Sequence, residues 1–166
     1  MADAEDVAAP SPALSVRAAG PADRALVSEM ARTTIGSELQ ALSTRGLIDV
    51  SGFAGLVAER AGEPAGFATY EITGDTLEVL AIGSLEGRTG TGRALMERLL
   101  DHAARAACTE IRVTTTDGNA GARAFYERLD YRVAEVRVGA VDECRRRYKP
   151  EIPEGMHDEI EYRRPV

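Results

Sequence analysis

The chain has 166 residues, 44% of them hydrophobic and 28% charged, which is the balance of a single soluble globular domain with a core of its own. Its formal net charge is −7 and its pI is near 5.0, so it lacks the broad basic surface that binding to a nucleic-acid backbone requires. We therefore expect no nucleic-acid partner.

Cysteine usage and apolar runs exclude further classes of protein. Cys108 and Cys144 lie far apart and belong to no C-x-x-C or Cys/His pattern, so no metal site is expected. No apolar run approaches the length of a membrane span, and the acidic start lacks the positive charge of a signal peptide. These features predict a cytoplasmic protein with no membrane partner.

In chain order, residues 1–13 are rich in Ala, Pro, Ser and acidic residues and predict a flexible tail, which one domain over 14–166 follows. A short strand is expected at 14–18. The segment 21–23 then opens a helix whose apolar residues recur at helical spacing. A second short helix is expected at 37–42, and the stretch after it shows no clear pattern.

The remaining elements alternate between the periods of strands and helices. Three apolar runs separated by turn residues predict an antiparallel meander, and the strand–helix–strand crossover that follows predicts a parallel pair. In order, we expect strands at 54–59, 65–72 and 76–82, a long helix at 90–107, a strand at 110–116, a helix at 119–129, a strand at 131–138, and after a loop a last strand at about 159–163.

Residues 87–94, Gly-Arg-Thr-Gly-Thr-Gly-Arg-Ala, lie between a predicted strand and the longest predicted helix. Glycines let backbone amides approach a ligand closely, and a helix N-terminus adds partial positive charge, so this segment suits a phosphate or pyrophosphate. A structural turn without a ligand is the alternative. A nucleoside-triphosphate loop is excluded because Arg93 and Ala94 replace its Lys and Ser/Thr, and Leu95 disfavours a dinucleotide fingerprint.

A second pattern opens the helix that follows the next strand. Asn119, Ala122 and Tyr126 are spaced i, i+3 and i+7 and therefore share one helix face, where the small Ala122 leaves room for a ligand. Asn119 also suits the N-cap position. The structural alternative is a capped helix whose neighbouring aromatic residues, Phe125 and Tyr126, anchor the core.

Together, the two patterns make residues 76–131 resemble the cofactor-binding core of the GNAT superfamily of acyl-CoA-dependent N-acyltransferases. The family has Gln/Arg-x-x-Gly-x-Gly/Ala at the mouth of the long helix, followed by a strand and Asn-x-x-Ala-x-x-Phe-Tyr. The chain departs from it at Gly87, where Gln or Arg is usual, and at Asp130, where glycine is common. Asp can adopt the left-handed turn required there with modest strain.

The resemblance implies an α/β (α+β) fold, with a mixed, mostly antiparallel central sheet flanked by helices and a splayed acyl-CoA cleft. It implies acetyl-CoA as co-substrate, no metal, and direct attack by an amine of an unidentified small molecule or peptide. The pantetheine arm would bond to a strand backbone and the pyrophosphate to amides of the glycine segment. The cofactor-binding residues implied are Leu80, Ala81, Ile82, Arg88, Thr89, Gly90, Thr91, Gly92, Arg93, Asn119, Ala122 and Tyr126.

The resemblance also implies catalytic roles. Tyr126 would protonate the leaving thiolate, since a phenol pKa of about 10 lies above that of a thiol. Glu78 is the candidate base, expected on the same strand face as Ile82 by alternation, with a water chain or no dedicated base as alternatives. A non-catalytic acyl-CoA sensor is the alternative function, and exposed sheet edges make a homodimer possible. The run 145–147, three arginines, is assigned no role.

Overall fold

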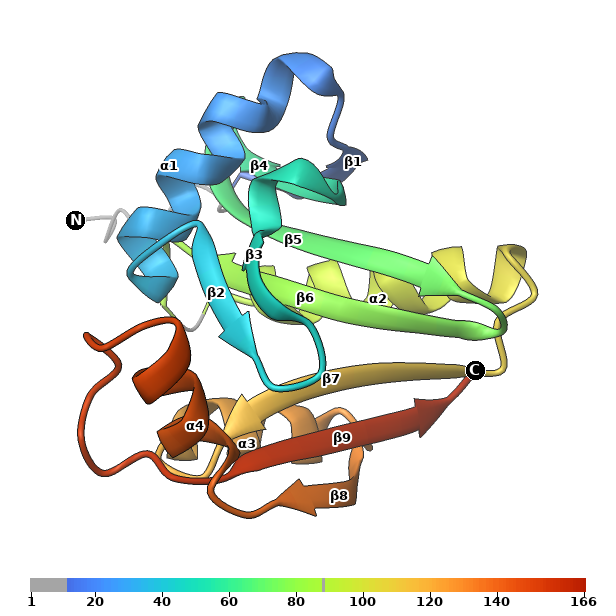
Figure 1. The fold of residues 1–166 in the computed structure, drawn as a ribbon. Helices are drawn as coiled ribbons and strands as arrows, with labels where there is room; N and C mark the ends of the chain where they lie inside the picture. The colour runs from blue at the N-terminus through green and yellow to red at the C-terminus, as the bar shows by residue number, and fades with distance from the viewer. Residues whose placement is uncertain (1–11, 88) are drawn as a thin grey trace, which may run out of the picture.

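A computed structural model describes residues 12–87 and 89–166 of the chain. Most of the predicted tail 1–13 and the predicted cofactor residue Arg88 therefore lie outside the described residues. Seven strands form one sheet in the order β1-β4-β5-β6-β7-β9-β8, and β2 and β3 form a separate hairpin in front of it (Figure 1). The elements are β1 (Leu14–Ala18), η1 (Pro21–Asp23), α1 (Arg24–Ile35), β2 (Leu39–Leu42), β3 (Gly46–Asp49), η2 (Val50–Gly52), β4 (Ala54–Arg60), β5 (Glu63–Thr73), β6 (Thr76–Ser84), α2 (Thr91–Arg105), β7 (Glu110–Thr116), α3 (Ala120–Arg128), β8 (Arg132–Arg137), α4 (Ala140–Arg147) and β9 (Glu159–Pro165).

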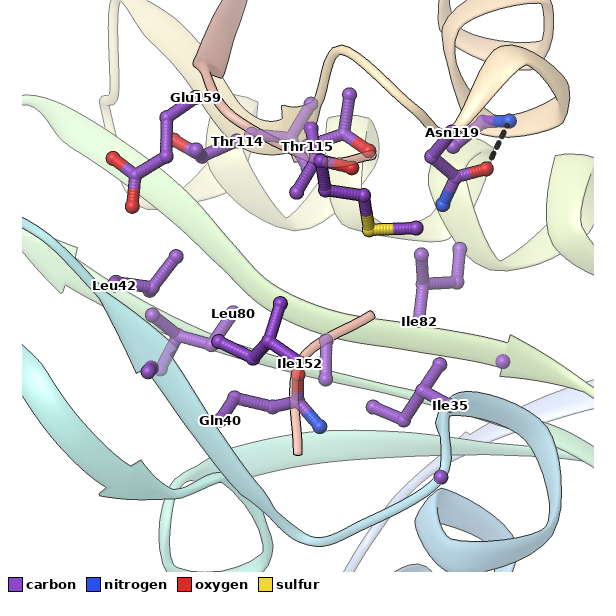
Figure 2. Close-up of a pocket in the computed structure, with 18 of the residues that line it drawn as sticks. Ile35, Gln40, Leu42, Leu80, Ile82, Thr114, Thr115, Asn119, Ile152 and Glu159 are labelled. Atoms are coloured by element: carbon purple, nitrogen blue, oxygen red, sulfur yellow. Dashed lines mark hydrogen bonds between the residues drawn. The ribbon is translucent and has the colours of Figure 1, made fainter. Parts of the chain in front are cut away.

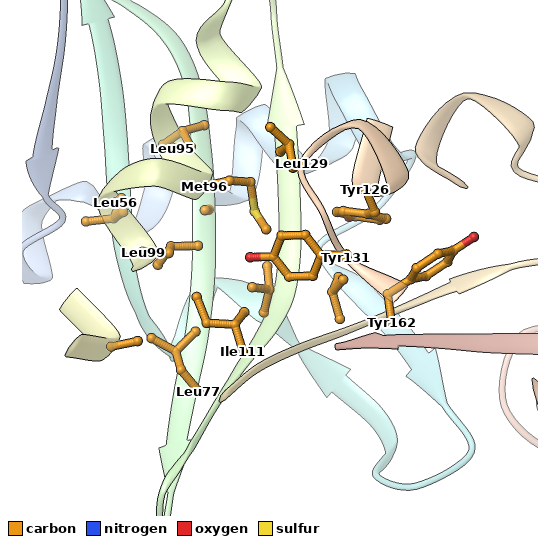
Figure 3. Close-up of a cluster of buried hydrophobic side chains, with 14 of the residues drawn as sticks. Leu56, Leu77, Leu95, Met96, Leu99, Ile111, Tyr126, Leu129, Tyr131 and Tyr162 are labelled. Atoms are coloured by element: carbon orange, nitrogen blue, oxygen red, sulfur yellow. The ribbon is translucent and has the colours of Figure 1, made fainter. Parts of the chain in front are cut away.

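Helices cover both faces of the sheet. The apolar stripe of α2 and the aromatic residues of α3 pack on one face, in a cluster we call the α2 core, with Leu95, Leu99, Tyr131 and Tyr162 fully buried (Figure 3). Helix α1 packs on the other face in a second cluster, the α1 core, around Phe67. The mixed, mostly antiparallel sheet flanked by helices confirms the predicted fold class.

Strands β6 and β7 form the parallel pair that the crossover predicted, but they pair over only part of their length. The register runs from Thr76–Glu110 to Val79–Val113, although both strands continue beyond it. Past this point β6 continues beside β5 and β7 continues beside β9. The sheet therefore opens into a V between its two central strands.

A β-bulge lies on β6 where the V begins. Ala81 pairs with Thr69 and Val79 pairs with Tyr70, so Leu80 is an extra residue opposite β5. A bulge of this kind reverses the alternation of side chains along a strand. Val79 accordingly packs in the α2 core, and both Leu80 and Ala81 pack in the α1 core.

Two segments differ from the sequence-based expectations. The helix expected at 37–42 is wrong, because these residues form β2 and pair with β3. Distant contacts hold this strand extended and override its helical propensity: the Lys149 ammonium donates to the carbonyl of Leu39 at 2.7 Å. The segment after β8, expected as a loop, contains α4. The predicted last strand is present as β9 and lies between β7 and β8. No helix in the described part of the chain is both long and apolar enough to span a bilayer.

Candidate active site

The open V between β6 and β7 holds a cavity of about 810 Å³. Residues of both central strands line it from opposite sides, and the end of α1, β2, α3 and the segment after α4 complete its walls (Figure 2). The cavity exists because two parallel strands separate, which leaves one edge of each without a neighbouring strand in the described chain. Such an edge can accept an extended ligand as an additional strand.

The β6 wall contains the three strand residues that the resemblance assigned to the pantetheine arm. Leu80, Ala81 and Ile82 all line the cavity, with Gly83 and Ser84 after them. Gly83 is required here for packing, because a Cβ at this position would lie 2.1 Å from Oγ1 of Thr34 on α1. The close approach of α1 fixes the β6 wall.

Helix α3 supplies the predicted helix face. Asn119, Ala122 and Tyr126 all line the cavity, together with Phe125. The Asn119 side-chain oxygen accepts a hydrogen bond from the Ala122 amide at 3.1 Å, which confirms the N-cap (Figure 2). Tyr126 is 5% exposed, and burial raises the pKa of its phenol above the ordinary value, so the hydroxyl keeps its proton at neutral pH.

The glycine segment forms the entry to α2 beside the cavity. Gly90 is the N-cap with φ +82°, and its carbonyl accepts the first helical hydrogen bond, from the Ala94 amide. Of the predicted residues here, Gly92 lines the cavity. Those that are described but do not line it are Thr89, Gly90, Thr91 and Arg93.

Arg60, at the end of β4, holds this segment in place. Its guanidinium donates to the Thr89 carbonyl at 3.2 Å and to the Glu86 carboxylate at 3.1 Å. No local sequence pattern marks Arg60, since its partners lie 29 and 26 residues away along the chain.

The structure corrects the placement of Glu78. The expectation that it shares a strand face with Ile82 is wrong, because the bulge at Leu80 reverses the alternation between them. Glu78 is 5% exposed and does not line the cavity. Its carboxylate instead accepts hydrogen bonds from Arg45 at 2.7 Å and from Arg112 at 3.2 Å.

The wall formed by α4, β9 and the segment between them contains residues that the sequence did not single out. Glu159 lines the cavity and accepts hydrogen bonds from the Ser43 amide at 2.7 Å and from Arg137 at 2.9 Å. Cys144 also lines it, and burial raises the pKa of its thiol, which disfavours the nucleophilic thiolate. His157 lies outside the lining, and its ring nitrogen Nδ1 lies 3.0 Å from the Asp142 carboxylate.

Within residues 12–87 and 89–166, no cluster of His, Cys, Asp or Glu side chains is arranged to hold a metal ion. The cavity itself presents the backbone edge of β6, hydroxyl groups, carboxylates, the Cys144 thiol and the Lys149 ammonium.

The mixed sheet that opens between two parallel strands, with helices on both faces, matches the fold of solved acetyltransferases. The chain belongs to the acetyltransferase (GNAT) family, whose model matches residues 26–131.

Comparison with known proteins agrees with this assignment. The uncharacterized protein YdhI of Bacillus subtilis is 38% identical over 106 residues, and this matched part is 64% of either chain. The match thus spans less than two thirds of that relative.

Solved structures share the fold at low identity. The ribosomal-protein-S18-alanine N-acetyltransferase of Escherichia coli has a TM-score of 0.70 at 20% identity, covering 93% of this chain and 94% of that one. A Bacillus subtilis acetyltransferase in complex with CoA has a TM-score of 0.74 at 14% identity, covering 93% and 99%.

Proposed function

We propose that the protein transfers the acetyl group of acetyl-CoA to a primary amine by direct attack. The observation that carries this proposal is one continuous cavity. It is lined by the part of β6 that does not pair with β7, by Gly92 at the entry of α2 and by Tyr126 on α3. A thioester carrier needs these three features together: a strand edge for its amide-containing arm, helix amides for its diphosphate and a proton donor near its sulfur.

The residues present fit such a carrier. Leu80, Ala81 and Ile82 would bind and orient the arm, and the helix N-terminus at Gly90 would face the diphosphate with its free amides. Tyr126 would donate its proton to the leaving sulfur, since its raised pKa keeps the phenol protonated. A protonated thiol at Cys144 favours direct transfer over an acyl-cysteine route.

The acceptor would approach from the side of β2 and the segment after α4, and we call this side of the cavity the acceptor-side wall. Apolar side chains dominate this wall, and they include Ile35, Leu42, Ile152, Pro153 and Met156. Among the described lining residues Lys149 is the one cation, and its ammonium is bound to the carbonyl of Leu39. The wall therefore suits an amine with an apolar substituent better than an amine that also carries a carboxylate.

The experiment is a thiol-release assay with acetyl-CoA and a panel that contains phenethylamine, phenylalanine, spermidine and an N-terminal peptide. We expect turnover, with phenethylamine preferred to phenylalanine, which differs from it by one carboxylate. Calorimetry should show acetyl-CoA binding. Absence of binding at millimolar acetyl-CoA would exclude the proposed function.

Removal of the Tyr126 hydroxyl tests its role. Tyr126→Phe should lower kcat by about 10²-fold, the lower end of general-acid contributions, and leave the acetyl-CoA Kd unchanged. Tyr148→Phe makes the same chemical change at a partly exposed ring outside the lining and should have no effect. An unchanged kcat in Tyr126→Phe would assign the proton transfer to another donor.

A non-catalytic acyl-CoA sensor is the second candidate function. The observation that favours it is the position of Glu78, whose carboxylate is bound by two arginines and lies outside the cavity lining. This function predicts acetyl-CoA binding by calorimetry without thiol release on any amine of the panel.

A further inference from the structure

The acceptor-side wall includes a segment without helix or strand. Residues 149–158 connect α4 to β9, and Lys149, Glu151, Ile152, Pro153 and Met156 within it line the cavity. An irregular segment has few backbone hydrogen bonds of its own, so its shape depends on contacts from elsewhere. Here three of those contacts come from one side chain of α4.

Arg145 binds three backbone carbonyls of this segment at once. Its Nε donates to the carbonyl of Ile152 at 2.9 Å, and its Nη2 donates to those of Pro153 at 2.7 Å and Met156 at 2.8 Å. Its Nη1 donates to the Asp142 carboxylate at 2.7 Å, and the side chain is 19% exposed. All these acceptors converge on one guanidinium, so the segment is folded around a single charged group.

The far end of the segment has additional contacts of its own. The Asp117 carboxylate accepts hydrogen bonds from the amides of His157 at 2.9 Å and Asp158 at 3.1 Å. Gly118 lies under Met156, where a Cβ would come within 2.7 Å of the Met156 Cγ. The end of the segment is thus tied to the turn before α3, whereas its middle depends on Arg145.

We propose that Arg145 is a positioning residue that sets the shape of the acceptor-side wall, and hence acceptor affinity, without contributing to acetyl-CoA binding. The acceptor part of this proposal rests on the proposed function. The partners of Arg145 lie on α4 and on the segment 149–158, whereas the cofactor residues lie on β6, α2 and α3. Loss of the Arg145 contacts should therefore change the affinity for the amine acceptor and leave the affinity for acetyl-CoA unchanged.

An arginine is required at this position for a geometric reason. The guanidinium presents five N–H donors in a rigid plane and can reach carbonyls that diverge from one another, whereas an ammonium is a compact point charge. The neighbouring Arg146 is exposed on the same helix turn and provides a matched control with the same change of charge.

The test compares Arg145→Ala, Arg145→Lys and Arg146→Ala by hydrogen exchange followed by mass spectrometry. We expect Arg145→Ala to accelerate amide exchange in 149–156 by about tenfold or more, because several charge-assisted hydrogen bonds are lost. Exchange in β7 and β9 should stay unchanged. Arg145→Lys should restore part of the protection, and Arg146→Ala should match the wild type.

Kinetics separate positioning from a general structural role. Arg145→Ala should raise the KM for phenethylamine, or for the fastest amine of the panel, with the acetyl-CoA Kd unchanged. Unchanged exchange in 149–156 would overturn the proposal, and so would an equal loss of acetyl-CoA affinity. If no amine of the panel reacts, the proposed function fails, but the exchange experiment still decides whether Arg145 holds this wall.

Discussion

Glu78 shows how backbone geometry decides the role of a single residue. Its position before Ile82 suggested a base beside the cofactor strand, but the bulge turns its carboxylate to the face where Arg45 and Arg112 lie. This buried carboxylate has two guanidinium partners and ties three parts of the chain together. The geometry therefore favours a structural role, and the assignment as base stays a prediction that a substitution can test.

Glu78→Gln should lower the free energy of unfolding by about 1–3 kcal/mol, since three part-buried hydrogen bonds from two guanidinium groups lose their carboxylate acceptor. Urea titration measures this change. Glu71→Gln, which removes a more exposed partner of the same Arg45, should cost less. If Glu78 were the base, the variant would instead lose turnover and the acidic limb of its pH–rate profile at unchanged stability.

At the scale of elements, the loop before α2, the proposed diphosphate site, is held in place by a side chain from another strand. Gly90 supplies the left-handed conformation that opens the helix, but the carbonyl of Thr89 and the carboxylate of Glu86 are bound by Arg60 of β4. The same arginine also donates to the carbonyl of Pro12 at 2.8 Å. One side chain thus joins the start of the described chain to the proposed diphosphate site.

Arg60→Ala should weaken acetyl-CoA binding by about tenfold, because the helix amides lose the support that orients them, and one charge-assisted hydrogen bond corresponds to roughly that factor. Calorimetry measures the Kd. Arg98→Ala removes the same charge from the exposed face of α2 and should leave the Kd unchanged. Equal losses in both variants would indicate a long-range charge effect instead of loop support.

For the whole molecule, surface ion pairs link stability to pH. Arg17 and the Gly20 amide lower the pKa of Asp23 from 3.8 to about 2, and Arg32 lowers the pKa of Glu38 from 4.5 to about 2. Both carboxylates bind protons less readily in the folded state than in the unfolded state. Their stabilising contributions are therefore fully present above about pH 4.5 and are lost as the pH falls towards 2.

The variant Asp23→Asn/Glu38→Gln should be less stable than the wild type at pH 6 and should approach it as the pH falls below 3. Thermal unfolding followed by circular dichroism across this pH range measures the stability of the variant and of the wild type. A stability difference that does not change with pH would show that the two pairs act by packing and not by charge.

Sequence by itself determined the features that depend on local chemistry. The apolar stripe of α2, the turn residues of the meander and the Asn119 cap each depend on neighbours a few residues away, and all are confirmed. Asp130 adopts the expected left-handed turn, with φ 66°. The family resemblance assigned residues 80–82 and the α3 face to the same cofactor, and both line one cavity.

Only the tertiary structure decided the features that depend on distant partners. The hairpin β2–β3 forms where local propensity favours a helix, and β9 inserts between β7 and β8 although it comes last in the chain. The contacts of Arg60 and Arg145, and the bulge that reverses the face of Glu78, depend on which strands and loops meet in space. Side-chain periodicity and local propensity do not show which distant segments come into contact. The acceptor-side wall could therefore be identified only from the tertiary structure.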